Sequence, residues 1–209
     1  MNLKYKYWYF TGALSSKFCD DVIKLALSKK INRGGTRSIE KTSNLSRKKL
    51  KDLKKYRDSN VVWLDERWIF ETLMPYIHAA NQNAGWNFEI DQAEKAQFTI
   101  YKKGQYYHWH ADAFVEPYNT PKDLKTHGKH RKLSVTINLT DPKKYKGGEF
   151  MMRDDDPKNP LKPLQIMVKE VVPRGSIVVF PSFLYHQIKP ITKGTRYSLV
   201  VWFIGKPFK

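Results

Sequence analysis

Two histidines and an aspartate are the residues whose types and spacing carry the clearest chemistry in this sequence. His110 and Asp112 are two positions apart, and side chains at positions i and i+2 of a β-strand point to the same side. His186 follows the run Ile177-Val178-Val179-Phe180, which predicts a buried strand able to return beside the first. Two histidines and a carboxylate cover one face of a coordination octahedron and leave three positions open, a ligand set that suits a non-haem Fe(II) ion.

Two other interpretations of the same residues stay open at this point. A His-x-Asp pair alone also fits a surface strand that carries two unrelated polar side chains. His108 lies two positions before His110, so these two histidines form a rival ligand pair on one strand face. Asp112 is preferred over His108 because Fe(II) centres with open positions use a carboxylate ligand.

An arginine and two tyrosines add a binding site for an organic acid. Arg196 comes ten residues after His186 and shortly before the apolar run Leu199-Val200-Val201-Trp202-Phe203, so its strand is predicted to be buried. A guanidinium group fixed deep in a pocket can hold a carboxylate with two parallel hydrogen bonds. Tyr101 and Tyr107 precede His110 at spacings that place them near the same cavity, although each also fits a core aromatic residue.

Two helices and a series of short strands must position these side chains. Ser15 or Ser16 is predicted to cap a first helix, and Asp65 a second one, within which Pro75 predicts a kink or an early start at that point. The stretch 32–59 is polar and basic and is predicted to be a long loop with a short helix near 46–55. Strands are predicted, from alternating apolar residues and turn signals, near 4–10, 94–101, 106–111, 132–140, 147–152, 165–171, 175–180, 184–189 and 196–204.

Two further motifs complete a recognisable pattern. Gly147-Gly148-Glu149-Phe150 opens a strand after a polar turn, and a tight turn at Gly175, a buried strand and a bend at Pro181 lead directly to His186. Over residues 95–204 the sequence resembles the prolyl 4-hydroxylase-like branch of the 2-oxoglutarate/Fe(II) oxygenases, close to bacterial and viral PKHD-type hydroxylases. The resemblance implies a mainly β (α+β) fold with a double-stranded β-helix (jelly-roll, cupin-like) core and N-terminal supporting helices. We therefore expect one domain over 1–209, with helical support and a basic loop in 1–93 and the jelly-roll in 94–204.

The resemblance also implies roles for individual residues. It implies an Fe(II)/2-oxoglutarate-dependent dioxygenase that hydroxylates a peptidyl substrate, commonly a prolyl residue, and releases succinate and CO2. The expected cofactors are Fe(II), 2-oxoglutarate and O2, with ascorbate as an accessory reductant. The metal ligands would be His110, Asp112 and His186, the 2-oxoglutarate contacts Arg196, Tyr101, Asn138 and Ser198, and the substrate contacts Arg57, Tyr107 and Trp202.

The charge of the chain bears on its partners. The net charge is +18, and residues 29–57 contain 12 Lys/Arg against Glu40 and Asp52. A basic loop of this kind fits an acidic peptide, a ribosome-associated target or nucleic acid, and it fits equally well a solvated surface without a partner. An oxygenase that acts on nucleic acid and a non-catalytic metal-binding jelly-roll are therefore alternatives. The single cysteine and the lack of a long apolar run predict a soluble cytoplasmic protein with no membrane partner and no internal disulfide.

Overall fold

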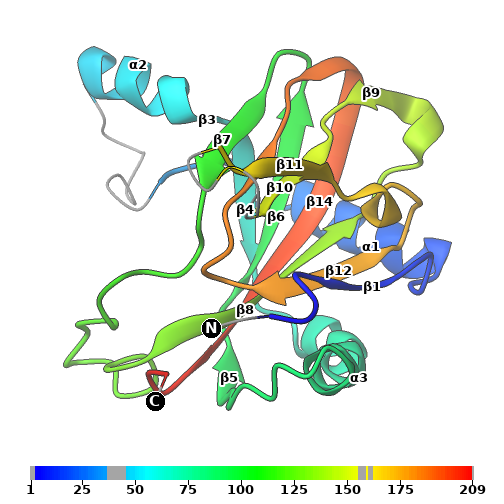
Figure 1. Ribbon diagram of the computed structural model, residues 1–209. Helices are drawn as coiled ribbons and strands as arrows, with labels where there is room; N and C mark the ends of the chain where they lie inside the picture. The colour runs from blue at the N-terminus through cyan, green and yellow to red at the C-terminus, as the bar shows by residue number, and fades with distance from the viewer. Residues whose placement is uncertain (1–2, 37–45, 155–158, 160–161, 209) are drawn as a thin grey trace.

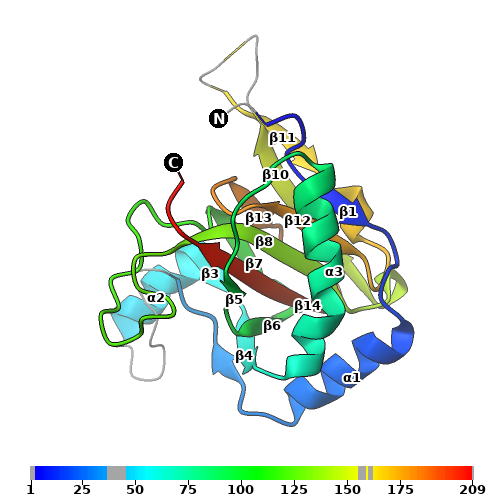
Figure 2. The ribbon, with the colours of Figure 1, turned by 90° about the horizontal axis from the view of Figure 1, so that it is seen from below.

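The computed structural model describes residues 3–36, 46–154, 159 and 162–208. Two antiparallel sheets face each other, and helices cover the outer side of the larger one (Figures 1 and 2). This arrangement confirms the predicted mainly β, jelly-roll fold. The larger sheet consists of β1 (Trp8–Phe10), β2 (Asn32–Arg33), β4 (Asn60–Leu64), β5 (Gln92–Ala93), β6 (Ala96–Lys102), β8 (His130–Asn138), β9 (Tyr145–Gly147), β12 (Ile177–Pro181) and β14 (Ile191–Gly205), and the smaller one of β3 (Arg57–Asp58), β7 (Tyr106–His110), β10 (Phe150–Asp154), β11 (Leu164–Met167) and β13 (His186–Ile188).

The strand order explains how distant segments meet. In the larger sheet the order is β1-β12-β8-β14-β6-β4-β2, with β5 and β9 paired to β14, and in the smaller sheet it is β11-β10-β13-β7-β3. The central strands β8, β14 and β6 therefore lie side by side although they are far apart in the chain. The same holds for β7 and β13, which carry the two histidines at the ends of their pairing.

Each face of the larger sheet has its own environment. Along β8, Leu133, Val135 and Ile137 are fully buried in the main hydrophobic core, which includes residues of α1 (Ser16–Leu27) and α3 (Arg67–Asn83). The alternate positions of β8, from Ser134 to Asn138, are polar and equally buried. Because strand side chains alternate between faces, these polar residues line the interior between the two sheets.

The helix starts test the capping predictions. Ser15 caps α1, since its Oγ accepts a hydrogen bond from the backbone N–H of Phe18 at 3.1 Å. The prediction that Asp65 caps the second helix is wrong: α3 begins after Glu66, and the Asp65 carboxylate instead pairs with Lys95 at 2.9 Å. Pro75 lies inside α3, which continues from Arg67 to Asn83, so the helix does not start at Pro75.

The predicted loop over 32–59 contains more structure than its composition suggests. It holds β2, β3 and the helix α2 (Arg47–Tyr56), which Ser46 caps. The short helix near 46–55 is thus confirmed, whereas residues 37–45 lie outside the described part of the chain. None of the described helices is long and apolar enough to cross a membrane.

Candidate metal centre and its pockets

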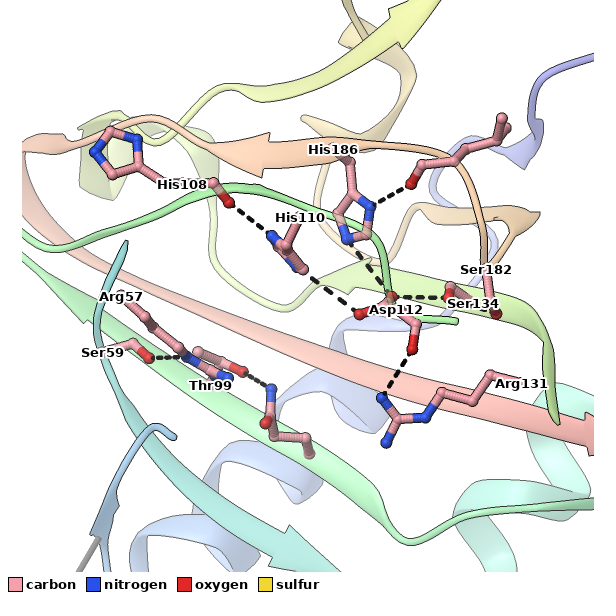
Figure 3. A network of polar contacts seen from close by, with 12 residues as sticks. Arg57, Ser59, Thr99, His108, His110, Asp112, Arg131, Ser134, Ser182 and His186 are labelled. Atoms are coloured by element: carbon pink, nitrogen blue, oxygen red, sulfur yellow. Dashed lines mark hydrogen bonds and ion pairs between the residues drawn. The ribbon is translucent and has the colours of Figure 1, made fainter. Parts of the chain in front are cut away.

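The two histidines and the aspartate of the sequence pattern converge on one point (Figure 3). His110 ends β7 and stands directly opposite His186, the first residue of β13, in the antiparallel pairing. Asp112 follows β7, and its Oδ1 and Oδ2 lie 3.8 Å and 3.5 Å from Nε2 of His110 and His186 respectively. One ligand atom from each residue lies within 4.8 Å of the others, a spacing that allows all three to contact a single ion.

Both imidazole rings are held in one orientation by the backbone. Nδ1 of His110 lies 2.7 Å from the carbonyl oxygen of His108, and Nδ1 of His186 lies 3.0 Å from that of Leu184. A carbonyl only accepts, so each Nδ1 carries the proton and each Nε2 presents a lone pair to the centre. His108 itself is exposed, and its ring packs edge-on against Tyr106. The rival pair of His108 and His110 therefore does not form a site.

The aspartate is anchored from the larger sheet. Ser134 Oγ on β8 donates to Asp112 Oδ2 at 2.8 Å and lies 2.9 Å from Ser182 Oγ. The backbone N–H of Asp112 donates to the carbonyl of Ser182 at 2.9 Å. These bonds fix the carboxylate although it follows the end of its strand. The polar alternation of β8 was a sequence signal for an inward-facing serine, but its partner could not be inferred from it.

The electrostatics of the cluster suit metal binding. Burial lowers the pKa of His110 to about 3, with a further contribution from the nearby His186. Burial alone would raise the pKa of Asp112, but His186, His110 and Arg131 together hold it below its ordinary value. A neutral His110 and an ionised Asp112 at neutral pH are the forms that bind a cation.

Arg196 lies in the interior between the sheets, and the prediction that its strand is buried is confirmed. Only 1% of its surface is exposed, and neither Nη1 nor Nη2 has a hydrogen-bond partner. It lines a cavity of about 160 Å³ together with Gly147, Gly148 and Tyr145. A buried guanidinium with two unsatisfied nitrogens is costly unless an anion pairs with it, so these atoms fit a carboxylate.

The other residues predicted around Arg196 share its surroundings to different degrees. Tyr101 pairs with Arg196 across β6 and β14 and is 3% exposed. Ser198 is two residues further along the same strand face and stands opposite Asn138. The Asn138 amide donates to the carbonyls of Thr140 and Val172 at 3.0 Å and 2.6 Å. It therefore braces the backbone here, and its contact with a co-substrate stays a prediction.

A larger cavity of about 500 Å³ reaches the cluster at Asp112. Asp112 lines it, as do the three residues predicted to contact substrate. The Tyr107 ring stacks on His110 with centroids 3.5 Å apart, and the Arg57 guanidinium lies 4.5 Å from the Tyr107 centroid. Arg57 Nη2 is a buried donor without a partner in the structure, and the buried Trp202 indole N–H faces the Asp112 carboxylate and lowers its pKa. The cavity thus offers aromatic walls and a free donor next to the cluster.

One charged pair in this cavity was missed from the sequence. The guanidinium of Arg131 donates to both oxygens of Glu94, at 2.8 Å and 2.6 Å, and stacks 3.9 Å from the Trp202 ring centroid. Tyr118 also donates to Glu94, at 2.7 Å. Glu94 and Arg131 are 37 residues apart, and no local pattern pairs such distant charges.

The fold and the His110–Asp112–His186 cluster together indicate a class of protein. A double-stranded β-helix that holds two histidines and a carboxylate between its sheets, beside a buried arginine, is the architecture of a non-haem metal oxygenase. The model of the 2OG-Fe(II) oxygenase superfamily matches residues 96–204, and the chain belongs to this superfamily.

Individual relatives agree with this membership. A PKHD-type hydroxylase from Xylella fastidiosa is 28% identical over 111 residues, which are 51% of this chain and 42% of the relative; the chain thus covers less than half of that protein. A prolyl-4-hydroxylase from Pseudomonas putida superposes with a TM-score of 0.66 at 17% identity over 96% of this chain and 93% of that one. A prolyl hydroxylase from Trichoplax adhaerens, solved with a hypoxia inducible factor peptide fragment, superposes with a TM-score of 0.60 at 17% identity. The match covers 96% of this chain and 84% of that one. At these identities the structural likeness shows the fold.

Proposed function

We propose that the chain is an Fe(II)- and 2-oxoglutarate-dependent hydroxylase of a peptidyl substrate, with a prolyl side chain as the first candidate. The observation that carries the proposal is the His110–Asp112–His186 cluster in the same interior as the unpartnered guanidinium of Arg196. The cluster and the guanidinium together support a site for a metal and an organic acid, which favours an enzyme over a metal-binding module without catalysis.

The three ligands would hold Fe(II), and Arg196 would hold the distal carboxylate of 2-oxoglutarate. Tyr101 supports this assignment: burial raises the pKa of its phenol, so the hydroxyl keeps its proton and can donate to the same anion. Ser198 adds a hydroxyl on the Arg196 face of β14, and Asn138 stands beside it. When bound, Fe(II), 2-oxoglutarate and O2 would supply the oxidising power to hydroxylate a C–H bond, with release of succinate and CO2, and ascorbate would keep the iron reduced.

The residues of the larger cavity would position the substrate. Arg57 Nη2 is an unpaired donor, so it suits a carbonyl oxygen of a peptide backbone, and the Trp202 ring would form an apolar wall beside it. The Tyr107 ring covers His110 and would keep water from that side of the metal while it packs against an apolar ring such as proline. The printed description of the Trichoplax structure, a prolyl hydroxylase with a bound peptide, supports a peptide in this position.

The test begins with the metal and co-substrate. Under anaerobic conditions, Fe(II) followed by 2-oxoglutarate should give wild-type protein the weak visible charge-transfer band of a chelated complex. His110→Ala should lose the band, and His108→Ala, two residues away on the exposed side, should keep it. A folded, iron-loaded wild type without the band would contradict the proposal.

The substrate class has a separate readout. Peptides that contain proline should stimulate succinate formation and gain the mass of one oxygen atom, and the same peptides with alanine in place of proline should not. Stimulation by the alanine peptides to the same extent would retain the hydroxylase and reject the prolyl substrate.

A further inference from the structure

The helix α2 forms a projecting basic ridge beside the mouth of the larger cavity. It carries six Lys/Arg and one acidic residue within ten positions, and it extends from the body of the protein at the upper left of Figure 1. Leu53 is 1% exposed and anchors the helix, while Tyr106 on β7 donates to the carbonyl of Lys54. The lysine side chains described on α2 are all exposed: Lys48, Lys49, Lys51, Lys54 and Lys55.

The charges of α2 work against the helix that carries them. Its first turn contains no acid and several cations, although the helix dipole favours negative charge there. Lys51 also has like-charged neighbours three and four positions away, Lys48 and Lys55, and such pairs destabilise a helix. Among the described residues, Lys48, Lys49 and Lys51 make no ion pair, whereas Lys55 contacts Asp52 at 2.9 Å. A polyanion along the ridge would relieve both kinds of repulsion.

Two exposed aromatic rings flank Arg57, which follows α2 and lines the cavity, one before it and one after it in the chain. Tyr56, the last residue of α2, is 63% exposed, and Trp63 on β4 is 45% exposed. Trp63 lines the cavity and lies 6.2 Å, between ring centroids, from Trp202. Lysines that follow a phosphate chain, together with rings on which bases stack, are the combination that binds single-stranded nucleic acid.

The same observations disfavour other polyanions. A membrane-binding helix presents an apolar face to the lipid, but Leu53 points into the protein and the exposed positions of α2 are mainly lysines. An acidic peptide would need the lysines but would gain little from exposed rings. We propose that α2, Tyr56 and Trp63 form a binding surface for single-stranded nucleic acid, with phosphates on the lysines and bases on the rings.

This surface has a consequence for the active site, and that consequence, unlike the binding itself, rests on the proposed hydroxylase function. Arg57 directly follows α2 and lines the cavity together with Trp63 and Trp202. A protein target bound to nucleic acid would be delivered to the active site, while the nucleic acid itself would stay outside. Binding can be measured without iron or co-substrate, so failure of the surface and failure of the enzymatic proposal are distinguishable.

The test is the binding of labelled single strands of about 20 nucleotides, as RNA and as DNA, over a salt series from about 50 to 200 mM. The variant Lys48→Gln/Lys49→Gln/Lys51→Gln removes three charges from the ridge. The matched control, Lys143→Gln/Lys144→Gln/Lys193→Gln, removes three exposed charges near β9, at the opposite edge in Figure 1. A separate variant, Tyr56→Ala, removes a ring without changing charge.

We expect the ridge variant to weaken binding about tenfold or more and to lower the slope of log affinity against log salt by about 2, since each phosphate contact on a single strand contributes about 0.7. The control should bind like wild type, and Tyr56→Ala should lose about fivefold or more. Tighter binding of RNA than of DNA would identify the physiological strand. Equal losses in both triple variants, or no binding at low salt, would overturn the proposal. So would equal competition by polyglutamate with no effect of Tyr56→Ala, which would indicate an acidic peptide.

Discussion

At the scale of single residues, the candidate site depends on groups that orient the three proposed metal ligands from behind. Asp112 illustrates this, because its carboxylate follows the end of β7 and is held from the other sheet by Ser134. The two histidines instead use backbone carbonyls two residues earlier in the chain. The aspartate is therefore the ligand whose position a single side-chain change can disturb.

Ser134→Ala should lower metal affinity about 10- to 100-fold, the usual cost of losing a partner that orients a ligand. Asp112 would keep its charge but lose the hydrogen bond that fixes Oδ2. Ser176→Ala is the matched control, since Ser176 is also a fully buried serine and its Oγ accepts from the N–H of Gly12. Titration with Fe(II) or Co(II) measures the effect, and equal affinities of the two variants would contradict it.

Arg196→Met should have opposite effects on two measurements. The buried guanidinium lacks a partner in the structure, so replacing it with an apolar side chain should stabilise the protein when 2-oxoglutarate is absent. Each kcal/mol gained would raise the thermal midpoint by about 2–4 °C for a chain of this size. The rise in midpoint that 2-oxoglutarate gives wild type should disappear in the variant. A variant still stabilised by 2-oxoglutarate would mean that another residue binds its carboxylate.

At the scale of elements, short strands do much of the positioning. The two-residue strand β3 pairs with β7 and places Arg57 beside Tyr107, and β2 pairs with β4. Gly34 follows β2, and a Cβ there would lie 2.4 Å from Ser59 Oγ and 2.7 Å from Arg57 Nε. Arg57 Nε donates to that same Ser59 Oγ. The absence of a side chain at Gly34 therefore leaves the space that this hydrogen bond occupies.

Gly34→Ala should therefore displace Arg57 without affecting the metal ligands. We expect reduced turnover of a peptide substrate, with a larger effect on KM than on kcat, while Fe(II) and 2-oxoglutarate bind as in wild type. Gly85→Ala is the contrast. Its positive φ makes the change destabilise the fold, but an added Cβ meets nothing within 4 Å, so it should lower stability without the specific rise in KM. Loss of iron binding in Gly34→Ala would show that the glycine supports the whole site.

The elements also show what the sequence could and could not predict. Periodicity located α1, α2 and the strands that carry His110, His186 and Arg196, because buried strands and amphipathic helices have local patterns. It missed β2 and β3, since two-residue strands in a basic, polar segment carry no periodic signal, and it also missed the five-residue strand β4. It also placed the start of α3 one residue early, because Asp65 is a good capping residue in isolation but pairs with Lys95 in the fold. The interactions of Ser134 with Asp112 and of Glu94 with Arg131 join positions 22 and 37 residues apart and depend on tertiary structure alone.

At the scale of the whole molecule, the segment 111–129 is tied to the body beside the larger cavity. Tyr118 donates to Glu94, Lys129 pairs with Asp91 at 2.9 Å, and Gln92 donates to the carbonyl of Lys125. All three contacts reach the short stretch 91–94. Glu94 is the central one, because it also neutralises Arg131 inside the cavity. This segment contributes Phe114 and Tyr118 to the lining of the cavity, so its attachment affects access to the site.

Glu94→Gln should loosen this attachment and leave the charge of Arg131 without its partner. An unsatisfied buried partner costs about 1–3 kcal/mol, so the thermal midpoint should fall by about 2–12 °C, and trypsin should cut faster after Lys122 and Lys125. Asp65→Asn is the control: its pair with Lys95 has both side chains 63% exposed, and such surface pairs contribute about 0–1 kcal/mol. Limited proteolysis followed by mass spectrometry locates the cuts. If Glu94→Gln destabilised the protein but cleavage in 111–129 stayed at the wild-type rate, the pair would support the core and would not hold this segment closed.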